Sequence, residues 1–415
     1  MEPTSGIIRT SFGLKDEIKP QLEESYHSTL INEIKANAFT WKAGRLTIRL
    51  AQEFGFCYGV DRAIDYAYQT RAKFPDRRIF LTNEIIHNPR VNSKLLEMGV
   101  QFLTGPYAQK DFETHLITKE DVVILPAFGT TIKQLNELQS IGCILVDTTC
   151  GSVMSVWKRV ESYAKDGFTS IIHGKYDHEE TLATSSRAIR YPEGKFLIVR
   201  DKGEALKVCE YIESDHRTKT TDQRQETEGR ENSKEEFLKE FANAVSVGFD
   251  PDRDLEKIGC ANQTTMLSSE SLEIANMLHD SIQKKYGKEG AWRFQHFDTI
   301  CSATQERQDA ELKLMEEGMN LMIVVGGYNS SNTGHLVEIS SEHCPAYHVK
   351  DASCILSKQL IQHKKAFSPD LIETSDWLPE GNITIGVTAG ASTPHRVIEE
   401  VIARVIRIAD ENFKH

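Results

Sequence analysis

Short runs of β-branched and other apolar residues alternate with longer stretches whose apolar positions recur at helical spacing over most of the chain. Runs such as RIFL, VVIL and CILV have the length and composition of buried strands, and each is followed by a polar loop and an amphipathic stretch. Strands that alternate with amphipathic helices are typical of α/β units built on parallel sheets. The pattern therefore predicts an α/β protein.

The junctions of strand, polar loop and helix fall into three successive groups of three. The first junction of each group contains a cysteine: Cys57 in LAQEFGFCYGV, Cys150 in LVDTTCGSV and Cys301 in FDTICSATQ. Ligands of open α/β sheets bind outside the carboxyl ends of the strands, where such loops emerge. We therefore expect three similar α/β units whose loops, with one cysteine from each, face a common central place.

This organisation predicts three α/β domains and two terminal segments. The N-terminal segment is expected to contain a helix at about residues 25–38. A segment at 213–235 has almost no apolar side chains, so we expect an exposed or disordered insertion there. The predicted divisions are an N-terminal arm at 1–44, domains at 45–147, 148–298 and 299–405, and a C-terminal tail at 406–415.

The three junction cysteines stand at or just before a predicted helix start, where the helix dipole favours the thiolate that binds metals. The other cysteines lie on apolar strands, on helical stretches or in intermediate positions, as expected of small core residues: Cys143, Cys209, Cys260, Cys344 and Cys354. Three thiolates suit either a zinc ion with an open water position or an iron–sulfur cluster with one iron left free. Spacing alone leaves both metals open.

The composition limits the classes of binding partner and the cellular locations that we expect. The formal net charge of -12 argues against a general binder of nucleic acid or membrane surfaces, although it permits a phosphate pocket built from local donors. No apolar run approaches the roughly 18 residues of a membrane span. The first residues lack a signal-peptide core and are acidic, so we expect a cytoplasmic protein, or one of the plastid stroma if an upstream transit peptide was removed.

Eight segments occur in order over about residues 45–405: FGFCYGVDRA, EIIHNP, DTTC, HGKYDHEET, NQTTM, TICSATQERQ, GGYNSSNTGHL and VTAGASTP. Together they resemble the 4-hydroxy-3-methylbut-2-enyl diphosphate reductase family, which acts last in the methylerythritol phosphate route to isoprenoids. The resemblance implies a trefoil of three pseudo-threefold-related α/β domains around a central [4Fe–4S] cluster with three cysteine ligands and one open iron site. It also implies reductive removal of the substrate's allylic hydroxyl, which gives isopentenyl and dimethylallyl diphosphate.

The same resemblance assigns residues by motif. Cys57, Cys150 and Cys301 match the cluster ligands, and Glu180 matches the acid that supplies a proton, with Thr265 beside it to relay the proton or orient the carboxyl group. The matched substrate-binding residues are His87, His178, Thr265, Ser330, Ser331, Asn332 and Ser392. The residues alone also permit a purely structural interpretation of these segments. NSSN could be an ordinary helix cap, and His178-x-Glu180 could be the polar start of an exposed helix.

One position departs from the family pattern. Phe128, in PAFGT, stands where many members have a third histidine, and phenylalanine cannot donate a hydrogen bond to a diphosphate. Either Thr130 and Thr131 compensate or the anion has fewer donors. The PAFG form, HGKYDHEET and the long N-terminal segment resemble the cyanobacterial and plant-plastid branch, for which the expected electron donor is ferredoxin, or flavodoxin.

Two other functions remain open at this stage. A three-cysteine zinc hydrolase would use the same thiolates, and a non-catalytic iron–sulfur electron carrier or sensor would use the same cluster. Carriers normally saturate their cluster with protein ligands and need no anion-binding loops, so the serine, asparagine and histidine loops favour catalysis. The glycine pair in VVGGYN lacks the spacing of a dinucleotide fingerprint, which argues against NAD binding.

Overall fold

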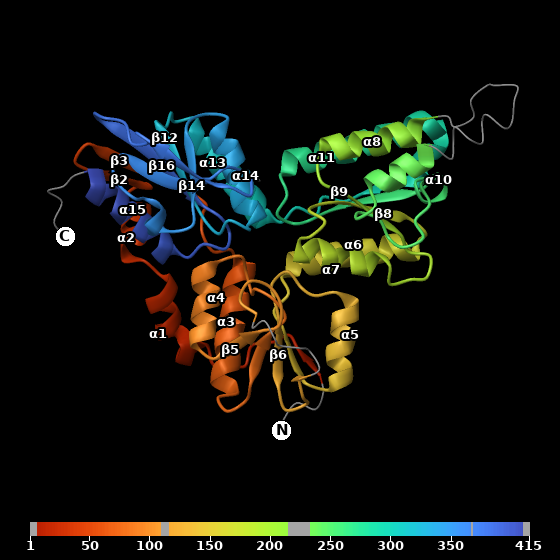
Figure 1. The fold of residues 1–415 in the computed structure, drawn as a ribbon, viewed down its shortest axis with the longest axis horizontal. Coiled ribbons are helices and arrows are strands. Elements are labelled where there is room, and N and C mark those ends of the chain that lie inside the picture. Colours follow the sequence, from red (N-terminus) through yellow and green to blue (C-terminus); the bar gives the residue numbers. More distant parts are fainter. Residues whose placement is uncertain (1–5, 109–115, 215–232, 367, 410–415) are drawn as a thin grey trace, which may run out of the picture. The chain divides into compact units, whose positions relative to one another are not determined.

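The protein is described here by a computed structural model that covers residues 6–108, 116–214, 233–366 and 368–409 (Figure 1). Within these ranges, strands and helices alternate and the strands form three sheets, which confirms the predicted α/β class. The chain divides into two compact units. The larger unit comprises Met1–Ala127, Ile141–Cys150 and Cys301–His415, and the smaller unit comprises Phe128–Ser140 and Gly151–Ile300.

The first sheet of the larger unit is parallel and has the strand order β1-β7-β6-β4-β5. Its central strands are buried along their whole length, as expected of a parallel sheet covered on both faces. Apolar residues of three helices pack with these strands in one core. The strands are β1 Ile7–Ile8, β4 Ile79–Leu81, β5 Val100–Phe102, β6 Val122–Leu125 and β7 Ile144–Asp147; the helices are α1 Lys15–Tyr26, α3 Tyr58–Lys73 and α4 Pro89–Glu97.

The second sheet of the larger unit has the order β15-β14-β13-β12-β16-β3-β2, parallel at its centre and antiparallel at both edges. Alternate residues of a strand point to opposite faces. Ile323 therefore packs with α2 and α15, whereas Met322 packs with α13 and Val324 with α14. The strands are β2 Thr40–Ala43, β3 Leu46–Leu50, β12 Leu321–Val325, β13 Ala346–Val349, β14 Leu360–Lys364, β15 Leu371–Ser375 and β16 Ile383–Ala389; the helices are α2 Thr29–Ala36, α13 Ser302–Met315, α14 Ser331–Ser341, η3 Ala352–Cys354 and α15 His395–Ala409.

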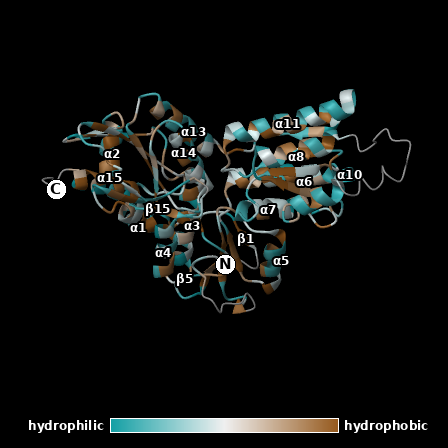
Figure 2. Cartoon of the chain, turned by 45° about the horizontal axis from the view of Figure 1, so that its top comes forward, coloured by the Kyte–Doolittle hydropathy of each residue, from teal (hydrophilic) through white to brown (hydrophobic). Residues whose placement is uncertain are grey.

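The smaller unit contains a parallel sheet of order β11-β10-β8-β9. Apolar residues of α8 and α11 form one core with the strands, and residues of α6 form another. Figure 2 shows hydrophobic strands and a hydrophilic outer side on α11. The strands are β8 Thr169–His173, β9 Phe196–Val199, β10 Ile258–Asn262 and β11 Phe294–His296; the helices are α5 Ile132–Ile141, α6 Gly151–Lys165, α7 Glu179–Ala188, α8 Lys202–Glu213, α10 Pro251–Asp254, α11 Ser268–Tyr286, η2 Gly287–Glu289 and α12 Gly290–Arg293.

The N-terminal residues differ from the expected appended arm. The helix expected at 25–38 is α2, but α1 precedes it, and the two strands of this segment belong to the two sheets of the larger unit: β1 pairs with β7 and β2 pairs with β3. Strand β3 follows the arm in sequence yet pairs with β16, near the other end of the chain. The domain boundaries themselves stay predictions.

Two further expectations concern segments at the limits of the described ranges. The polar insertion predicted at 213–235 lies outside the described residues except at its two ends, and the tail predicted at 406–415 is described only to residue 409, where it completes α15. None of the helices in the described ranges has the length and hydrophobicity that crossing a bilayer requires.

Candidate functional site

Cys57 lies at the N-terminal cap of α3, in a loop tied to the opposite end of the chain. The backbone N–H of Cys57 donates to the carbonyl of Ala391 (3.2 Å), and that of Gly55 donates to the carbonyl of Ala389 (3.2 Å). Burial raises the pKa of the Cys57 thiol, and the backbone N–H of Val60 acts in the opposite direction. The first turn of α3 therefore supplies a donor that stabilises a thiolate at this position.

Cys150 ends the loop that follows β7, and hydrogen bonds order that loop. Asp147 Oδ1 accepts from the backbone N–H and the hydroxyl of Thr149 (3.0 and 2.5 Å), while the N–H of Cys150 donates to the carbonyl of Ala127 (2.9 Å). Arg62 of α3, the helix that Cys57 caps, donates to the carbonyls of Thr148 and Thr149. The helix that Cys57 caps is thus bonded to the loop that carries Cys150.

The sulfur atoms of Cys57 and Cys150 face the same glycine. A Cβ built on Gly59 would lie 2.6 Å from Cys150 Sγ and 3.9 Å from Cys57 Sγ. Cys150 also adds to the rise in the pKa of Cys57, because two neighbouring thiolates repel each other. A bound cation removes this repulsion, so the pair fits the ligands of a thiophilic metal or cluster.

Cys301 is the N-terminal cap of α13, in the same unit. Its Sγ accepts from the backbone N–H of Thr304 (3.3 Å) and lies 3.0 Å from the Thr304 hydroxyl oxygen. A sulfur that receives donors at a helix N-terminus has its thiolate favoured. The structure thus places Cys57 and Cys301 at helix caps and Cys150 directly before α6, as the sequence predicts.

Replacing Gly59 with alanine is expected to separate the two sulfurs, since the new Cβ would overlap Cys150 Sγ. Overpacking of this kind costs about 1–3 kcal/mol of folding free energy. We expect lower thermal stability and a loss of thiolate-to-metal absorbance after metal loading. Gly151→Ala is the matched control, because nothing lies within 4 Å of a Cβ at that position beside Cys150. Equal metal loading in both variants would contradict the prediction.

The larger unit also gathers polar side chains from three loops. Asn332 Oδ1 accepts from the backbone N–H of Ala391 (2.9 Å), and Ser392 Oγ donates to the carbonyl of His87 (3.3 Å). Within the described part of the chain, Asn332 Nδ2 is buried and makes no hydrogen bond, so it is a donor without a protein acceptor. The predicted anion-binding residues of this unit are all buried: His87, Ser330, Ser331, Asn332 and Ser392.

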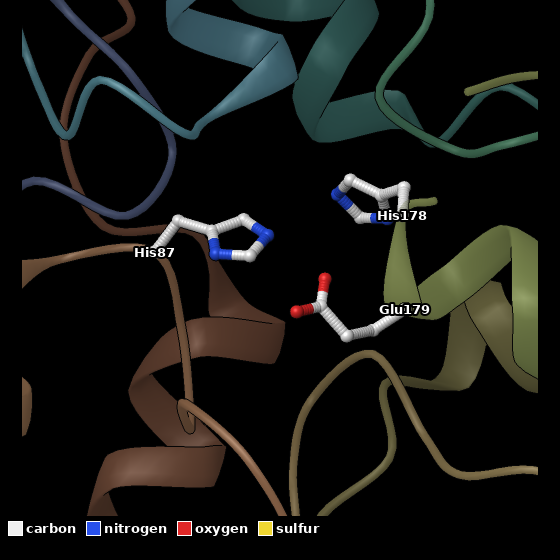
Figure 3. A group of neighbouring side chains, drawn as sticks. All are labelled: His87, His178 and Glu179. Atoms are coloured by element: carbon white, nitrogen blue, oxygen red, sulfur yellow. The ribbon is translucent and has the colours of Figure 1, made fainter. Parts of the chain in front are cut away.

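His87 is held by a carboxylate that the motif search did not single out. His87 Nδ1 lies 2.9 Å from Glu84 Oε2, and Glu84 Oε1 accepts from Asn92 Nδ2 (3.0 Å). Figure 3 shows the imidazole of His87 on the loop that leads into α4. The bond to Glu84 fixes the orientation of the ring and turns Nε2 away from that carboxylate.

In the smaller unit, His178 caps the N-terminus of α7, and Figure 3 shows its side chain and that of Glu179 at the start of this helix. His178 Nδ1 accepts from the backbone N–H of Glu180 (3.1 Å). The neutral ring therefore has its proton on Nε2, which is the tautomer that donates to an anion.

Phe128, the departure from the family pattern, packs edge-on against His178, with ring centroids 5.4 Å apart. Compensation by Thr130 and Thr131, one of the two alternatives, stays a prediction. Thr130 donates to Gln134 Oε1, and Thr131 accepts from the Gln134 backbone N–H (3.3 Å), so both hydroxyls bind the first turns of α5. Phe128 thus packs against the His178 ring and supplies no hydrogen-bond donor of its own.

Glu180 is almost fully buried in the first turn of α7, so the exposed polar helix start considered for this segment is wrong. Its Oε1 accepts from the backbone N–H of Thr264 (2.6 Å) and its Oε2 from the Thr264 hydroxyl (2.9 Å). Thr265, predicted beside Glu180, instead accepts from Gln263 Nε2 (2.7 Å). Sequence reasoning missed Thr264 because adjacent residues of the NQTT segment are indistinguishable by motif.

The chain is similar to known proteins over most of its length. The family model described as "LytB protein" matches residues 48–406. A 4-hydroxy-3-methylbut-2-enyl diphosphate reductase of Gloeobacter violaceus is 47% identical over 413 residues, covering 98% of this chain and 93% of the relative. The corresponding Microcystis aeruginosa protein is 49% identical over 407 residues, covering 98% and 95%. The solved E-1-hydroxy-2-methyl-but-2-enyl-4-diphosphate reductase of Plasmodium falciparum shares the fold, with a TM-score of 0.60, 21% identity and 86% of each chain covered.

Proposed function

We infer that this chain, which belongs to the LytB protein family, is a 4-hydroxy-3-methylbut-2-enyl diphosphate reductase. This oxidoreductase removes the allylic hydroxyl of its diphosphate substrate reductively and releases isopentenyl and dimethylallyl diphosphate, the last step of the non-mevalonate route. The observation on which the inference rests most is the identity of 47–49% to reductases over 98% of the chain. The cysteine and anion-binding loops described above supply the chemistry that this reaction needs.

The LytB family uses an iron–sulfur cluster, and we propose a [4Fe–4S] cluster held by Cys57, Cys150 and Cys301, with one iron free of protein ligands. The proposal is supported by the facing sulfurs of Cys57 and Cys150 and by the donors around Cys301. When bound, such a cluster supplies single electrons and a Lewis-acidic iron. Soft thiolate ligands suit both iron–sulfur clusters and zinc, so the metal is distinguished by experiment.

We propose that the diphosphate is bound by His87, His178, Thr265, Ser330, Ser331, Asn332 and Ser392. The free Nδ2 donor of Asn332 and the Nε2–H tautomer of His178 support this assignment. Buried donors arranged before the ligand arrives strengthen binding of an anion, because they need not reorganise.

Replacing Glu84 with glutamine is expected to raise the substrate KM about tenfold while kcat changes little. Glu84 orients the His87 ring through its bond to Nδ1, and loss of a hydrogen bond to a charged group costs about 1.5–3 kcal/mol. Steady-state kinetics with the diphosphate substrate measure the effect. Glu97→Gln is the control, since Glu97 is an exposed partner of Lys94 on the neighbouring helix. A lower kcat with unchanged KM would contradict a role of Glu84 in substrate binding through His87.

We propose that Glu180 donates the proton with which the substrate's hydroxyl leaves as water. After the transfer, the carboxylate keeps both Thr264 donors, one on each oxygen, and these stabilise the charge that the transfer creates. Burial excludes bulk water as a competing proton source. Thr265 is proposed to contact the substrate beside this acid.

The proposed electron donor is ferredoxin, or flavodoxin, and the proposed location is the cytoplasm, with the plastid stroma as the alternative. These assignments rest on the similarity to cyanobacterial reductases. Reduction of the purified enzyme by each donor, compared with an artificial reductant, tests the first of them.

The function is tested with protein purified anaerobically and supplied with the substrate and an artificial electron source. We expect brown protein that converts the substrate to isopentenyl and dimethylallyl diphosphate. Colourless protein with stoichiometric zinc would favour a three-cysteine hydrolase instead. Brown protein that exchanges electrons without consuming substrate would favour a carrier.

A further inference from the structure

A buried cation stands close to Cys57. Arg307 of α13 is only 3% exposed. Its Nε and Nη2 both donate to the carbonyl of Gly55 (3.2 and 2.6 Å), and its Nη1 donates to the carbonyl of Ala303 (2.7 Å). Within the described ranges, the guanidinium forms no ion pair with a carboxylate, and the oxygens that it binds are those of neutral backbone carbonyls.

A buried charge without a counter-ion is costly to fold, so a nearby anion is expected. Gly55 is two residues from Cys57, so the guanidinium that binds the Gly55 carbonyl places a buried positive charge beside the loop that presents the Cys57 sulfur. Asp61 of α3, an exposed carboxylate, also feels this charge, although desolvation raises its pKa overall. Lys35 of α2 is itself a cation, and the charge of Arg307 acts to lower its pKa. A cluster held by thiolate ligands would supply negative charge beside this cation.

The loop that Arg307 holds has little freedom to move. Gly55 has a φ of +76°, and a Cβ there would lie 3.1 Å from the carbonyl oxygen of Thr393 and 3.2 Å from the ring of His395. Gly55 is therefore in contact with the residues at the start of α15, and Arg307 adds two hydrogen bonds to its carbonyl. Fixing Gly55 fixes the backbone that leads to Cys57.

We propose that Arg307 is a positioning residue of the cluster site, which holds the Gly55–Cys57 loop and supplies buried positive charge beside the cluster. The proposal rests on the proposed function in that it requires a cluster on Cys57. Reduction adds a negative charge, and a nearby cation stabilises the reduced form more than the oxidised form. Arg307 is therefore expected to raise the reduction potential of the cluster.

Two variants separate the charge from the hydrogen bonds. Arg307→Met removes both, whereas Arg307→Lys keeps the charge but loses the planar fork that makes two bonds to Gly55. Arg404→Met is the matched control: Arg404 of α15 also donates to two backbone carbonyls, those of Ile355 and Leu356 (3.0 and 2.9 Å). All proteins are purified and reconstituted anaerobically, and the midpoint potential and the rate of iron release to a chelator are measured without substrate.

We expect Arg307→Met to shift the potential to more negative values and to release iron about tenfold faster than the wild type. Arg307→Lys is expected to keep the potential but to release iron faster, and Arg404→Met to change neither. If Arg307→Met does not fold, Arg307→Lys decides, because wild-type iron release in that variant would overturn the positioning role. An unchanged potential in Arg307→Met would overturn the electrostatic role.

The measurements also separate this proposal from the proposed function. A wild-type protein that binds no iron–sulfur cluster would overturn both. A wild-type protein with a cluster but without reductase activity would overturn the proposed function and leave the potential and iron-release results to decide the role of Arg307.

Discussion

Replacing Cys150 with serine is expected to leave a folded protein that loses its iron–sulfur cluster and more than about 100-fold of its turnover. Serine is nearly isosteric, and the bonds that order this loop come from Asp147, Thr149 and the backbone of Cys150, all of which the variant keeps. The serine hydroxyl, however, is a hard and neutral ligand where a soft thiolate is needed. Mutation of a residue that only hydrogen-bonds a metal ligand typically lowers metal affinity or activity by about 10–100-fold. Loss of a ligand itself is therefore expected to lower turnover further.

Iron content, visible absorbance and turnover are the measurements, and circular dichroism establishes that the variant folds. Cys143→Ala is the control, because Cys143 is buried seven positions earlier and burial raises its pKa to about 11. Burial and a raised pKa both disfavour the thiolate that a metal requires, so Cys143 is expected to make no contribution to cluster binding. Full iron content in Cys150→Ser, or loss of iron in Cys143→Ala, would contradict the ligand assignment.

The fold class could be predicted from the sequence because each strand and helix has its own hydrophobic pattern within a short segment. Buried strands such as β6 and β12 are continuous apolar runs, and the loops after them are polar. The cap positions of Cys57 and Cys301 are local in the same way, since a short loop and a helix start identify them. The pairing of β3 with β16 is not local, because nothing in either strand specifies a partner more than 300 residues away.

The residues that sequence reasoning missed act through contacts across the fold. Glu84 became visible only once its carboxylate was placed against His87, and Thr264 only through its bonds to Glu180, 84 residues away. Arg307 lies within a segment that the resemblance had matched, but its bond to Gly55 spans 252 residues. Motifs identify which residue types are present, whereas hydrogen-bond partners are fixed by packing.

Replacing Glu180 with glutamine is expected to lower kcat by about 10²–10⁴-fold, the range that general acids contribute, with KM and the cluster absorbance little changed. Glutamine has the size of glutamate, but its amide protons are too weakly acidic to be transferred to the departing hydroxyl. Its carbonyl oxygen accepts one of the two Thr264 bonds, while its amide group cannot accept the other. The variant therefore separates loss of the acid from loss of the side chain.

Glu213→Gln is the matched control, because Glu213 of α8 also accepts from a hydroxyl, that of Ser281 (2.9 Å), within the same unit. If the large loss of kcat appears in Glu180→Gln alone, the effect belongs to the proton and not to a general cost of neutralising a bonded carboxylate. Equal kcat in wild type and Glu180→Gln would assign the proton to another donor. An unchanged rate of electron uptake by the variant's cluster, together with lost product formation, would place the defect at the protonation of the departing hydroxyl.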